Sequence, residues 1–182
     1  MPALTGPSLV VAALLALAGA QKLLDPTMTV GALRALRLPS APALVRLGSA
    51  AELALGVTAI AFGGAVLWLL VAASYLAFGA FVVAALRRGT MIGSCGCFGR
   101  EETPPHATHV VLNVVLAALA VAVATWSPGA PLSDLVERPG SGLVVAGLVA
   151  LALVLLHAAF VDLPRALAPV GPPSARRPSI SR

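Results

Sequence analysis

Long apolar runs alternate with short polar segments along the chain. The runs are Ser8–Leu24, Leu44–Leu86, His109–Trp126 and Leu143–Phe160. About 20 helical residues cross the hydrocarbon core of a bilayer. The second run is much longer than one crossing, so we expect two helices joined by a tight turn at Gly63–Gly64. The pattern therefore predicts five membrane-crossing helices.

The polar segments predict where the helices end. The Asp25-Pro26 pair ends the first helix, because a residue before proline disfavours helical geometry. Within the segment that follows, Val30–Leu38 is a short interfacial helix by this interpretation. Arg87–Gly89 ends the third crossing. No cation precedes the first run, as a cleaved secretory signal would require, so we expect that run to be retained as a helix.

These elements predict an all-α integral membrane protein with three regions. Residues 1–126 form a four-helix transmembrane bundle. Residues 127–162 form an extra-cytoplasmic connection and a fifth, C-terminal transmembrane helix. Residues 163–182 are rich in Pro, Ser and Arg and have no means of building a core, so they are expected to be a disordered basic tail in the cytoplasm.

Composition gives the same answer. Apolar residues make up 59% of the chain and charged residues 10%, and the mean hydropathy is +0.97. A soluble domain needs more charge to cover its exterior, so the lipid bilayer is the expected partner of this surface. The net charge of +5 does not indicate nucleic-acid binding, because the cations are scattered and form no basic face. The Arg, Ala, Gly and Pro content is typical of a bacterial protein from a GC-rich genome.

The cations also predict the orientation in the membrane. With five crossings, Arg138 alone falls on one side. The other side collects Lys22, Arg34, Arg37, Arg46, Arg87, Arg88, Arg100, Arg165, Arg176, Arg177 and Arg182. Cytoplasmic loops are enriched in Lys and Arg. We therefore expect the amino terminus outside the bacterial inner membrane, and the loop after the third helix and the tail inside.

That loop contains the only two cysteines of the chain, Cys95 and Cys97, within the segment Gly93–Gly99. A Cys-x-Cys pair can cycle between dithiol and disulfide. The bridge would close a small, strained ring, and strained exposed disulfides tend to be reactive. Gly96 between the sulfurs allows the sharp backbone bend that this requires. The leading prediction is thiol–disulfide redox chemistry.

Two other functions stay open. Cys95, Cys97, His106 and His109 are sulfur and imidazole ligands suited to zinc or copper(I), which would make the chain a metal-binding or metal-delivery protein. Their spacing matches no common zinc pattern. The other alternative is a non-catalytic membrane assembly subunit, for which the two cysteines are incidental. Whether the chain is an enzyme is left open by the sequence.

Two ionisable residues interrupt the apolar runs. Lys22 and Glu52 lie inside helices predicted to cross the membrane, where a charge is costly and indicates function. They either pair with each other, or Lys22 extends to the surface while Glu52 pairs with Arg46. Asn113 is expected to hydrogen-bond between helices or to orient the cysteine loop. His157 is expected to be a packed or interface residue.

The residues resemble a known family. The segments Ala18–Pro26 and Glu52–Gly56 are similar to the first two helices of the DoxX-like membrane proteins. Cys95–Gly99, with Asn113 downstream, is similar to their MauE branch, named for methylamine utilisation. The resemblance covers about residues 8–126.

This resemblance implies a helical bundle that supports thiol–disulfide exchange beside a thioredoxin-like partner. Cys95 and Cys97 would then be the redox pair. The supporting positions implied by the motifs are Lys22, Glu52, Asn113, Gly96, Phe98 and Gly99. No cofactor follows from the residues; a quinone or a metal ion is compatible with them. Disulfide formation belongs to an oxidising compartment, yet the cations place the cysteines inside. Either the loop accepts electrons from cytosolic thiols, or the charge rule fails here.

Overall fold

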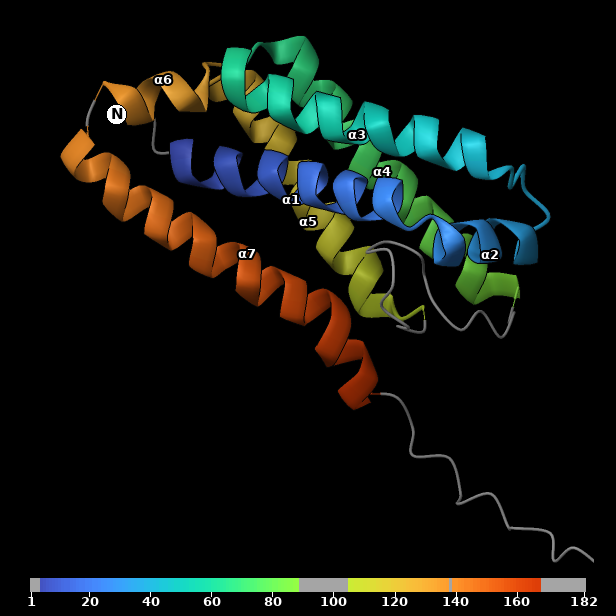
Figure 1. Ribbon diagram of the computed structural model, residues 1–182. Coiled ribbons are helices and arrows are strands. Elements are labelled where there is room, and N and C mark those ends of the chain that lie inside the picture. Colours follow the sequence, from blue (N-terminus) through green and yellow to red (C-terminus); the bar gives the residue numbers. More distant parts are fainter. Residues whose placement is uncertain (1–3, 89–104, 138, 168–182) are drawn as a thin grey trace, which may run out of the picture.

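The structure is a computed structural model that describes residues 4–88, 105–137 and 139–167, and every regular element in these ranges is a helix (Figure 1). The helices are α1 (Thr5–Leu24), α2 (Thr27–Ala35), α3 (Pro42–Phe62), α4 (Ala65–Arg88), α5 (Ala107–Trp126), α6 (Pro131–Val136) and α7 (Pro139–Leu167). Among them α1, α3, α4, α5 and the Gly142–Phe160 part of α7 are long and apolar enough to cross a membrane. The predicted all-α membrane fold is confirmed.

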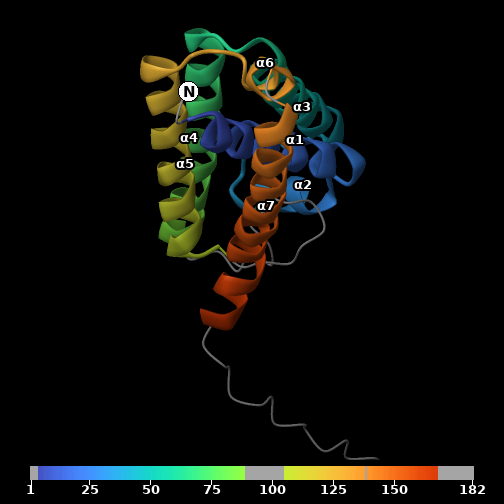
Figure 2. The same cartoon turned by 90° about the vertical axis from the view of Figure 1, so that its left-hand side faces the viewer.

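The bundle consists of two helix pairs, α1 with α3 and α4 with α5, and α7 runs along one side (Figure 2). Glycines bring α1 and α3 close together. A Cβ atom on Gly19 would lie 2.7 Å from the Ser49 carbonyl oxygen, and one on Gly56 would lie 2.8 Å from the Ala16 nitrogen. Small residues at helix contacts allow this approach within lipid, where no hydrophobic force draws helices together.

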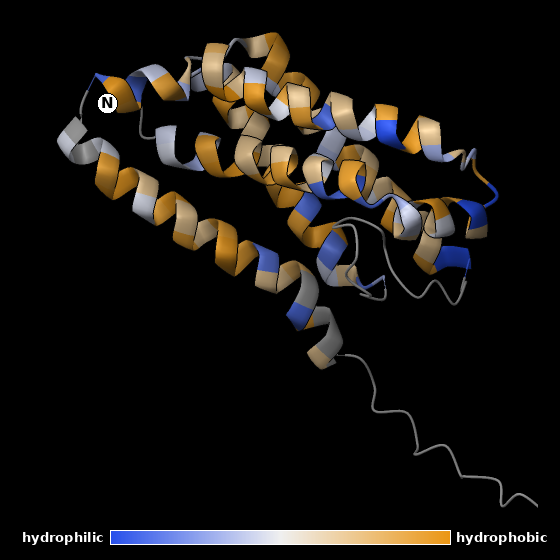
Figure 3. Ribbon diagram, in the orientation of Figure 1, coloured by the Kyte–Doolittle hydropathy of each residue, from blue (hydrophilic) through white to orange (hydrophobic). Residues whose placement is uncertain are grey.

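The two pairs enclose a core of large apolar side chains. Leu14 and Leu15 of α1, Trp68 of α4 and Leu116 of α5 are almost fully buried. The outward faces are apolar as well, most clearly on α7, where Leu143 and Leu148 are 79% and 61% exposed. Figure 3 shows apolar residues along the crossing helices and hydrophilic ones gathered mainly near their ends. Apolar surface on both sides is expected for helices solvated by lipid.

One end of the bundle, here called the turn end, is closed by backbone contacts. Gly63 and Gly64 form the predicted turn between α3 and α4 with φ of 65° and 100°, values that favour glycine. The Gly64 N–H donates to the Pro128 carbonyl over 2.6 Å. The Thr5 hydroxyl donates to Asp134 of α6 over 2.6 Å. These bonds tie α1, the turn and α6 together.

The opposite end, here called the loop end, holds α2 and the ends of α1 and α4. Asp25 closes α1 through its N–H, 2.9 Å from the Gln21 carbonyl. Its carboxylate accepts from the Thr27 N–H over 3.1 Å and so begins α2. The Arg88 guanidinium at the end of α4 donates to the Leu36 carbonyl after α2. The chain leaves α4 here at Arg88 and enters the described range again at Pro105.

Three features of the helices differ most clearly from the sequence predictions. The helix α2 covers Thr27–Ala35 instead of Val30–Leu38, and the Asp25 carboxylate before its N-cap Pro26 accepts from the N–H of its first residue, Thr27. The short helix α6 was not predicted, since its six residues are too few for a periodic pattern. The fifth crossing helix, α7, runs from Pro139 to Leu167 and so enters the region expected to be a disordered tail from residue 163. The rest of that tail, 168–182, lies outside the described residues.

The continuation of α7 has a structural reason. Pro164 has no N–H, so it cannot bond to the carbonyl of Phe160 four residues earlier. That carbonyl lies 2.9 Å from Nε2 of His109 on α5, which can donate to it. A side chain of a neighbouring helix thus offers this carbonyl a donor where proline has no N–H, as seen for prolines in membrane helices.

Candidate functional site

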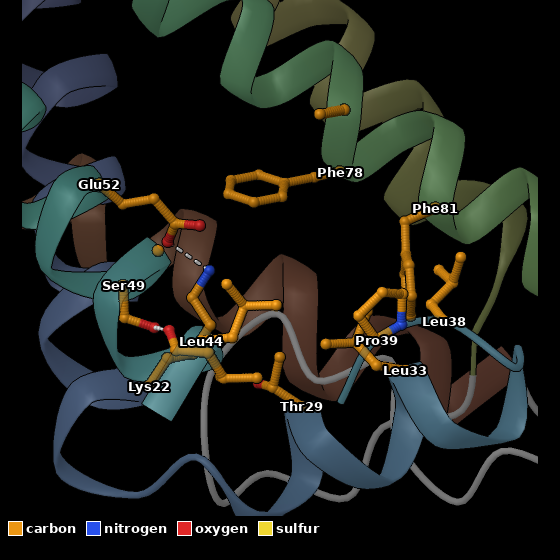
Figure 4. Close-up of a pocket in the computed structure, with 13 residues that line it drawn as sticks. Lys22, Thr29, Leu33, Leu38, Pro39, Leu44, Ser49, Glu52, Phe78 and Phe81 are labelled. Atoms are coloured by element: carbon orange, nitrogen blue, oxygen red, sulfur yellow. Dashed lines mark hydrogen bonds and ion pairs between the residues drawn. The ribbon is translucent and has the colours of Figure 1, made fainter. Parts of the chain in front are cut away.

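A buried ion pair lies near the loop end of the bundle. Lys22 in the last turn of α1 pairs with Glu52 in the middle of α3, and the two side chains are 5% and 20% exposed (Figure 4). The Lys22 ammonium also lies 4.4 Å from the centroid of the Phe78 ring on α4. Burying a charge is costly unless it is paired. The carboxylate and the electron-rich ring face together offset that cost.

The sequence left two arrangements of these charges open, and the structure has the first. Lys22 does not extend to the surface, because its side chain is almost completely buried. Arg46, the other proposed partner of Glu52, is exposed, and within the described residues the ion pair found for Glu52 is with Lys22. Gln21, next to Lys22, has a buried side-chain oxygen without a hydrogen-bond partner among the described residues.

A cavity of about 430 Å³, here called the loop-end cavity, opens beside this ion pair. Parts of four helices and the linker after α2 form its walls, as Figure 4 shows. The polar lining residues are Lys22, Thr29, Ser49 and Glu52. The remaining ones are Leu33, Leu38, Pro39, Leu44, Val45, Gly48, Ala77, Phe78 and Phe81. A mostly apolar cavity with a few polar groups at one place is the usual form of a small-molecule site.

Aromatic residues of α4 line the cavity and connect it to the core. Phe78 contacts Tyr75 edge to face, with ring centroids 6.2 Å apart. The buried Tyr75 hydroxyl donates to the Val11 carbonyl of α1 over 2.7 Å. Sequence analysis did not select Tyr75, Phe78 or Phe81. These three aromatic residues are spaced three apart on one helix, so they share a face of it, and this spacing could have indicated an aromatic wall near Lys22.

Ser49 was also missed as a cavity residue. It lies one turn before Glu52 on α3, it is 2% exposed, and its hydroxyl donates to the Val45 carbonyl over 2.8 Å. Ser49 lies opposite Gly19 of α1, where its small side chain allows close packing of the two helices. Its carbonyl and hydroxyl thus serve both the helix contact and the wall of the cavity.

The predicted residues of α5 form a separate buried group. Asn113 is 2% exposed and donates to the His109 carbonyl of its own helix over 2.7 Å. The bond it makes within α5 is therefore local and does not join two helices. Asn113 also contributes to the wall of a small void together with Tyr75, Phe78 and Phe160, so it lies near the aromatic cluster of α4.

His106 and His109 cap the start of α5. The His106 ring accepts from the Thr108 N–H over 3.2 Å. The fully buried His109 uses both ring nitrogens, Nε2 toward the Phe160 carbonyl and Nδ1 toward the His106 N–H at 3.2 Å. Engaged in this way, His109 acts as a structural link between α5 and α7, with both ring nitrogens in contact with backbone groups. No cluster of potential metal ligands is present among the residues that the structure describes.

The cysteine motif itself cannot be placed. Cys95 and Cys97, together with Gly96, Phe98 and Gly99, lie outside the described residues. The two points where the described chain meets this segment are known, however. Arg88 ends α4 at the loop end, seven residues after the cavity-lining Phe81, and Pro105 precedes the cap of α5. The segment is therefore attached to the end of the bundle that holds the ion pair and the cavity. His157, on α7, is partly buried, as expected for a packing residue.

The fold and this site define a class: a multi-pass helical membrane protein with an ionisable pair buried among its crossing helices. Comparison with protein families is more specific. The family model described as "Methylamine utilisation protein MauE" matches residues 2–127. The chain therefore belongs to the MauE family, which confirms the resemblance read from the motifs. Comparisons with curated proteins and with solved structures gave no match.

Proposed function

We propose that this protein is a membrane thiol–disulfide redox protein in which Cys95 and Cys97 alternate between dithiol and disulfide. One observation carries the proposal. The only two cysteines of a 182-residue chain are separated by a single residue, in the segment that joins Arg88 to Pro105 at the loop end. Membership in a family named for methylamine utilisation supports a role in that process.

The proposed exchange follows ordinary disulfide chemistry. A thiolate of a partner dithiol attacks the Cys95–Cys97 disulfide and forms a mixed disulfide with one of the two sulfurs. The second partner thiolate attacks that mixed bond and releases the dithiol form of this protein. The partner loses two electrons and two protons, and the Cys95–Cys97 pair gains them. A thioredoxin-like protein is the proposed partner, since its Cys-x-x-Cys pair carries out this reaction.

Trapping of the mixed disulfide tests the proposal. The exchange is reversible, so trapping uses its reverse direction: a Cys95→Ser or Cys97→Ser variant given the oxidised partner keeps one thiol that can attack the partner disulfide but lacks the second thiol that would resolve the mixed disulfide. One of the two variants should therefore accumulate a covalent complex that reducing agent dissolves. The double variant is the control and should capture nothing. Native membranes should also show the wild-type pair shifting between thiol and disulfide when oxidant or reductant is added. A pair that stays in one state under both treatments would overturn the proposal.

The orientation is part of the proposal and needs its own measurement. The excess of cations at the loop end supports a cytoplasmic position for the cysteines and an external amino terminus in the inner membrane. A membrane-impermeant thiol reagent should then label Cys95 and Cys97 in inverted vesicles and not in intact cells. The opposite labelling would place the redox pair in the oxidising compartment. It would leave the exchange chemistry intact and overturn the charge-based topology.

A further inference from the structure

The cavity at the loop end has a polar part whose charges are already balanced. Lys22 and Glu52 form an ion pair in its wall, so the site as a whole presents no net charge to a ligand. An anionic head group would be drawn to the ammonium and repelled by the carboxylate beside it. An ammonium has three N–H donors, and a carboxylate accepts several hydrogen bonds. The pair is suited to an uncharged head that can both accept and donate.

The rest of the cavity suits a flat, apolar molecule. Phe78 and Phe81 of α4 line it on one side, and Leu33 and Leu44 are among the aliphatic side chains of the other walls. Phe78 is held by its edge-to-face contact with Tyr75. Aromatic side chains favour stacked or edge contacts with another ring. A volume of about 430 Å³ accommodates a substituted ring and the beginning of a chain.

The cavity is open between two helices that cross the membrane, and the lining residues Leu38 and Pro39 at the loop end are exposed as well. Gly48 and Leu44 of α3 and Ala77 of α4 line it and are exposed. The helices α3 and α4 are joined at the turn end and contact each other far less than α1 contacts α3. Since their exposed faces meet hydrocarbon, a ligand entering between them comes from the lipid.

We propose that the loop-end cavity binds a quinone, with its carbonyl groups at Lys22 and Glu52 and its isoprenoid chain toward the gap between α3 and α4. The ammonium can donate to a quinone oxygen, and the carboxylate can accept a hydrogen bond from the quinol hydroxyl. The wall of the cavity is tied to Arg88, the last described residue before the cysteine segment, because Arg88 bonds to the Leu36 carbonyl two residues before Leu38 of the lining.

This binding site extends the proposed redox function and its reaction step rests on that function. The Cys95 and Cys97 thiols would give two electrons and two protons to the quinone, forming the Cys95–Cys97 disulfide and the quinol. Together with exchange at the partner, the net reaction is oxidation of a partner dithiol by a membrane quinone. The quinone supplies the oxidant that repeated cycles of disulfide exchange require.

Binding is tested first, without the redox step. The full-length Cys95→Ser, Cys97→Ser double variant, purified in lipid nanodiscs, is titrated with a ubiquinone that carries a two-unit isoprenoid chain. Saturable binding is expected, and oleate and phosphatidylglycerol should not displace the probe. A lack of saturable binding would overturn the quinone assignment. Displacement of the probe by either lipid would also overturn it and would indicate a lipid site instead.

A substitution locates the site. Gly48→Leu places a side chain into the cavity from a position where a Cβ meets no atom within 4 Å, so it should fold normally and weaken binding on the order of tenfold or more. Gly147→Leu on α7 is the matched control, because its Cβ also meets nothing and Gly147 does not line the cavity. Equal binding by both variants would place the quinone elsewhere and overturn the proposal.

The redox step is then tested with the wild-type cysteines. Quinone should reoxidise the reduced Cys95–Cys97 pair in nanodiscs, and Gly48→Leu should slow this reaction while Gly147→Leu should not. Cysteines that never change state, in a protein that still binds quinone, would overturn the proposed redox function and leave the binding site standing. If the cysteines exchange with a partner but the protein binds no quinone, only the proposed quinone site would be overturned.

Discussion

The turn end of the bundle brings backbone against backbone, whereas the loop end separates its helices around a cavity and a buried ion pair. At the turn end, Gly63 packs on Gly129, and the Gly64 N–H bonds to the Pro128 carbonyl. At the loop end, Lys22 and Glu52 face one another in the wall of a cavity of about 430 Å³. Both ends belong to the same helices, α3 and α4.

The difference shows where this fold concentrates stability and where it concentrates chemistry. Close backbone contacts at the turn end fix the relative position of α3 and α4, because a packed glycine turn has few alternative conformations. With one end fixed, the helices can diverge toward the other end and leave room between them. The buried charges lie in that room, where a functional role offsets their cost to stability.

The largest effect is expected from breaking the ion pair. Lys22→Met leaves the Glu52 carboxylate buried without its partner, and loss of one member of a buried pair costs about 3–5 kcal/mol of unfolding free energy. Reversible unfolding in mixed micelles measures it. Adding Glu52→Gln to Lys22→Met should recover much of the loss, because no uncompensated charge remains.

Arg46→Met is the matched control for this test. Arg46 is an exposed cation on α3 at the same end of the bundle, so its removal should change the unfolding free energy by less than about 0.5 kcal/mol. If Lys22→Met lowered the unfolding free energy no more than Arg46→Met does, Lys22 and Glu52 would not be coupled in the folded protein. The loop end would then hold no buried ion pair that distinguishes it from the turn end.

A glycine-to-alanine pair compares the two ends directly. Gly63→Ala should destabilise by about 2–3 kcal/mol, because φ of 65° with ψ of −151° is a conformation essentially reserved for glycine and the new Cβ would meet the Gly129 backbone. Gly48→Ala on the same helix meets open space and should stabilise α3 by up to about 1 kcal/mol. The measurement is again the unfolding free energy, and changes of the same sign would contradict the comparison.

The sequence predicted the turn end better than the loop end, for physical reasons. The Gly63–Gly64 pair inside a long apolar run gave both the number of crossings and the place of the turn. Such a signal is local, since it depends on chain length and on the conformational freedom of glycine. The charged residues Lys22 and Glu52 were found by an equally local signal, an ionisable group within an apolar helix.

Their pairing was not predictable, because it depends on how α1 and α3 are rotated about their axes. That rotation is set by Gly19 and Gly56, whose contacts involve the backbone of the opposite helix. No local sequence pattern indicates the cavity, since its walls come from α1, α2, α3 and α4, and it depends on how these helices are arranged in space. Likewise, the bond from His109 to the Phe160 carbonyl, to which Pro164 has no N–H to donate, joins residues 51 positions apart.

That long-range bond gives the next prediction. His109→Phe should destabilise the protein by about 1–3 kcal/mol, because it leaves the buried Phe160 carbonyl without the His109 donor. Pro164→Ala supplies a backbone N–H at the helical position that can bond to this carbonyl. In the Pro164→Ala background, His109→Phe should therefore cost less. Strictly additive effects in this double-mutant cycle would show that His109 does not replace the missing bond of Pro164.

The smallest expected effect lies beside the wall of the cavity, where Arg37 follows the end of α2 with φ of 57°, a left-handed conformation that favours glycine. The Leu38 N–H bonds to the Leu33 carbonyl over 2.9 Å across this bend, so the bend positions two cavity residues. Arg37→Gly relieves the side-chain strain but increases the freedom of the unfolded chain, for a net gain of about 0.5 kcal/mol. Arg34→Gly, inside α2, should instead cost about 1 kcal/mol, because glycine is unfavourable within a helix. A gain in unfolding free energy for Arg37→Gly and a loss for Arg34→Gly would show that the left-handed backbone bend at Arg37 stabilises the loop-end wall. A loss for both variants would show that the arginine side chain stabilises it.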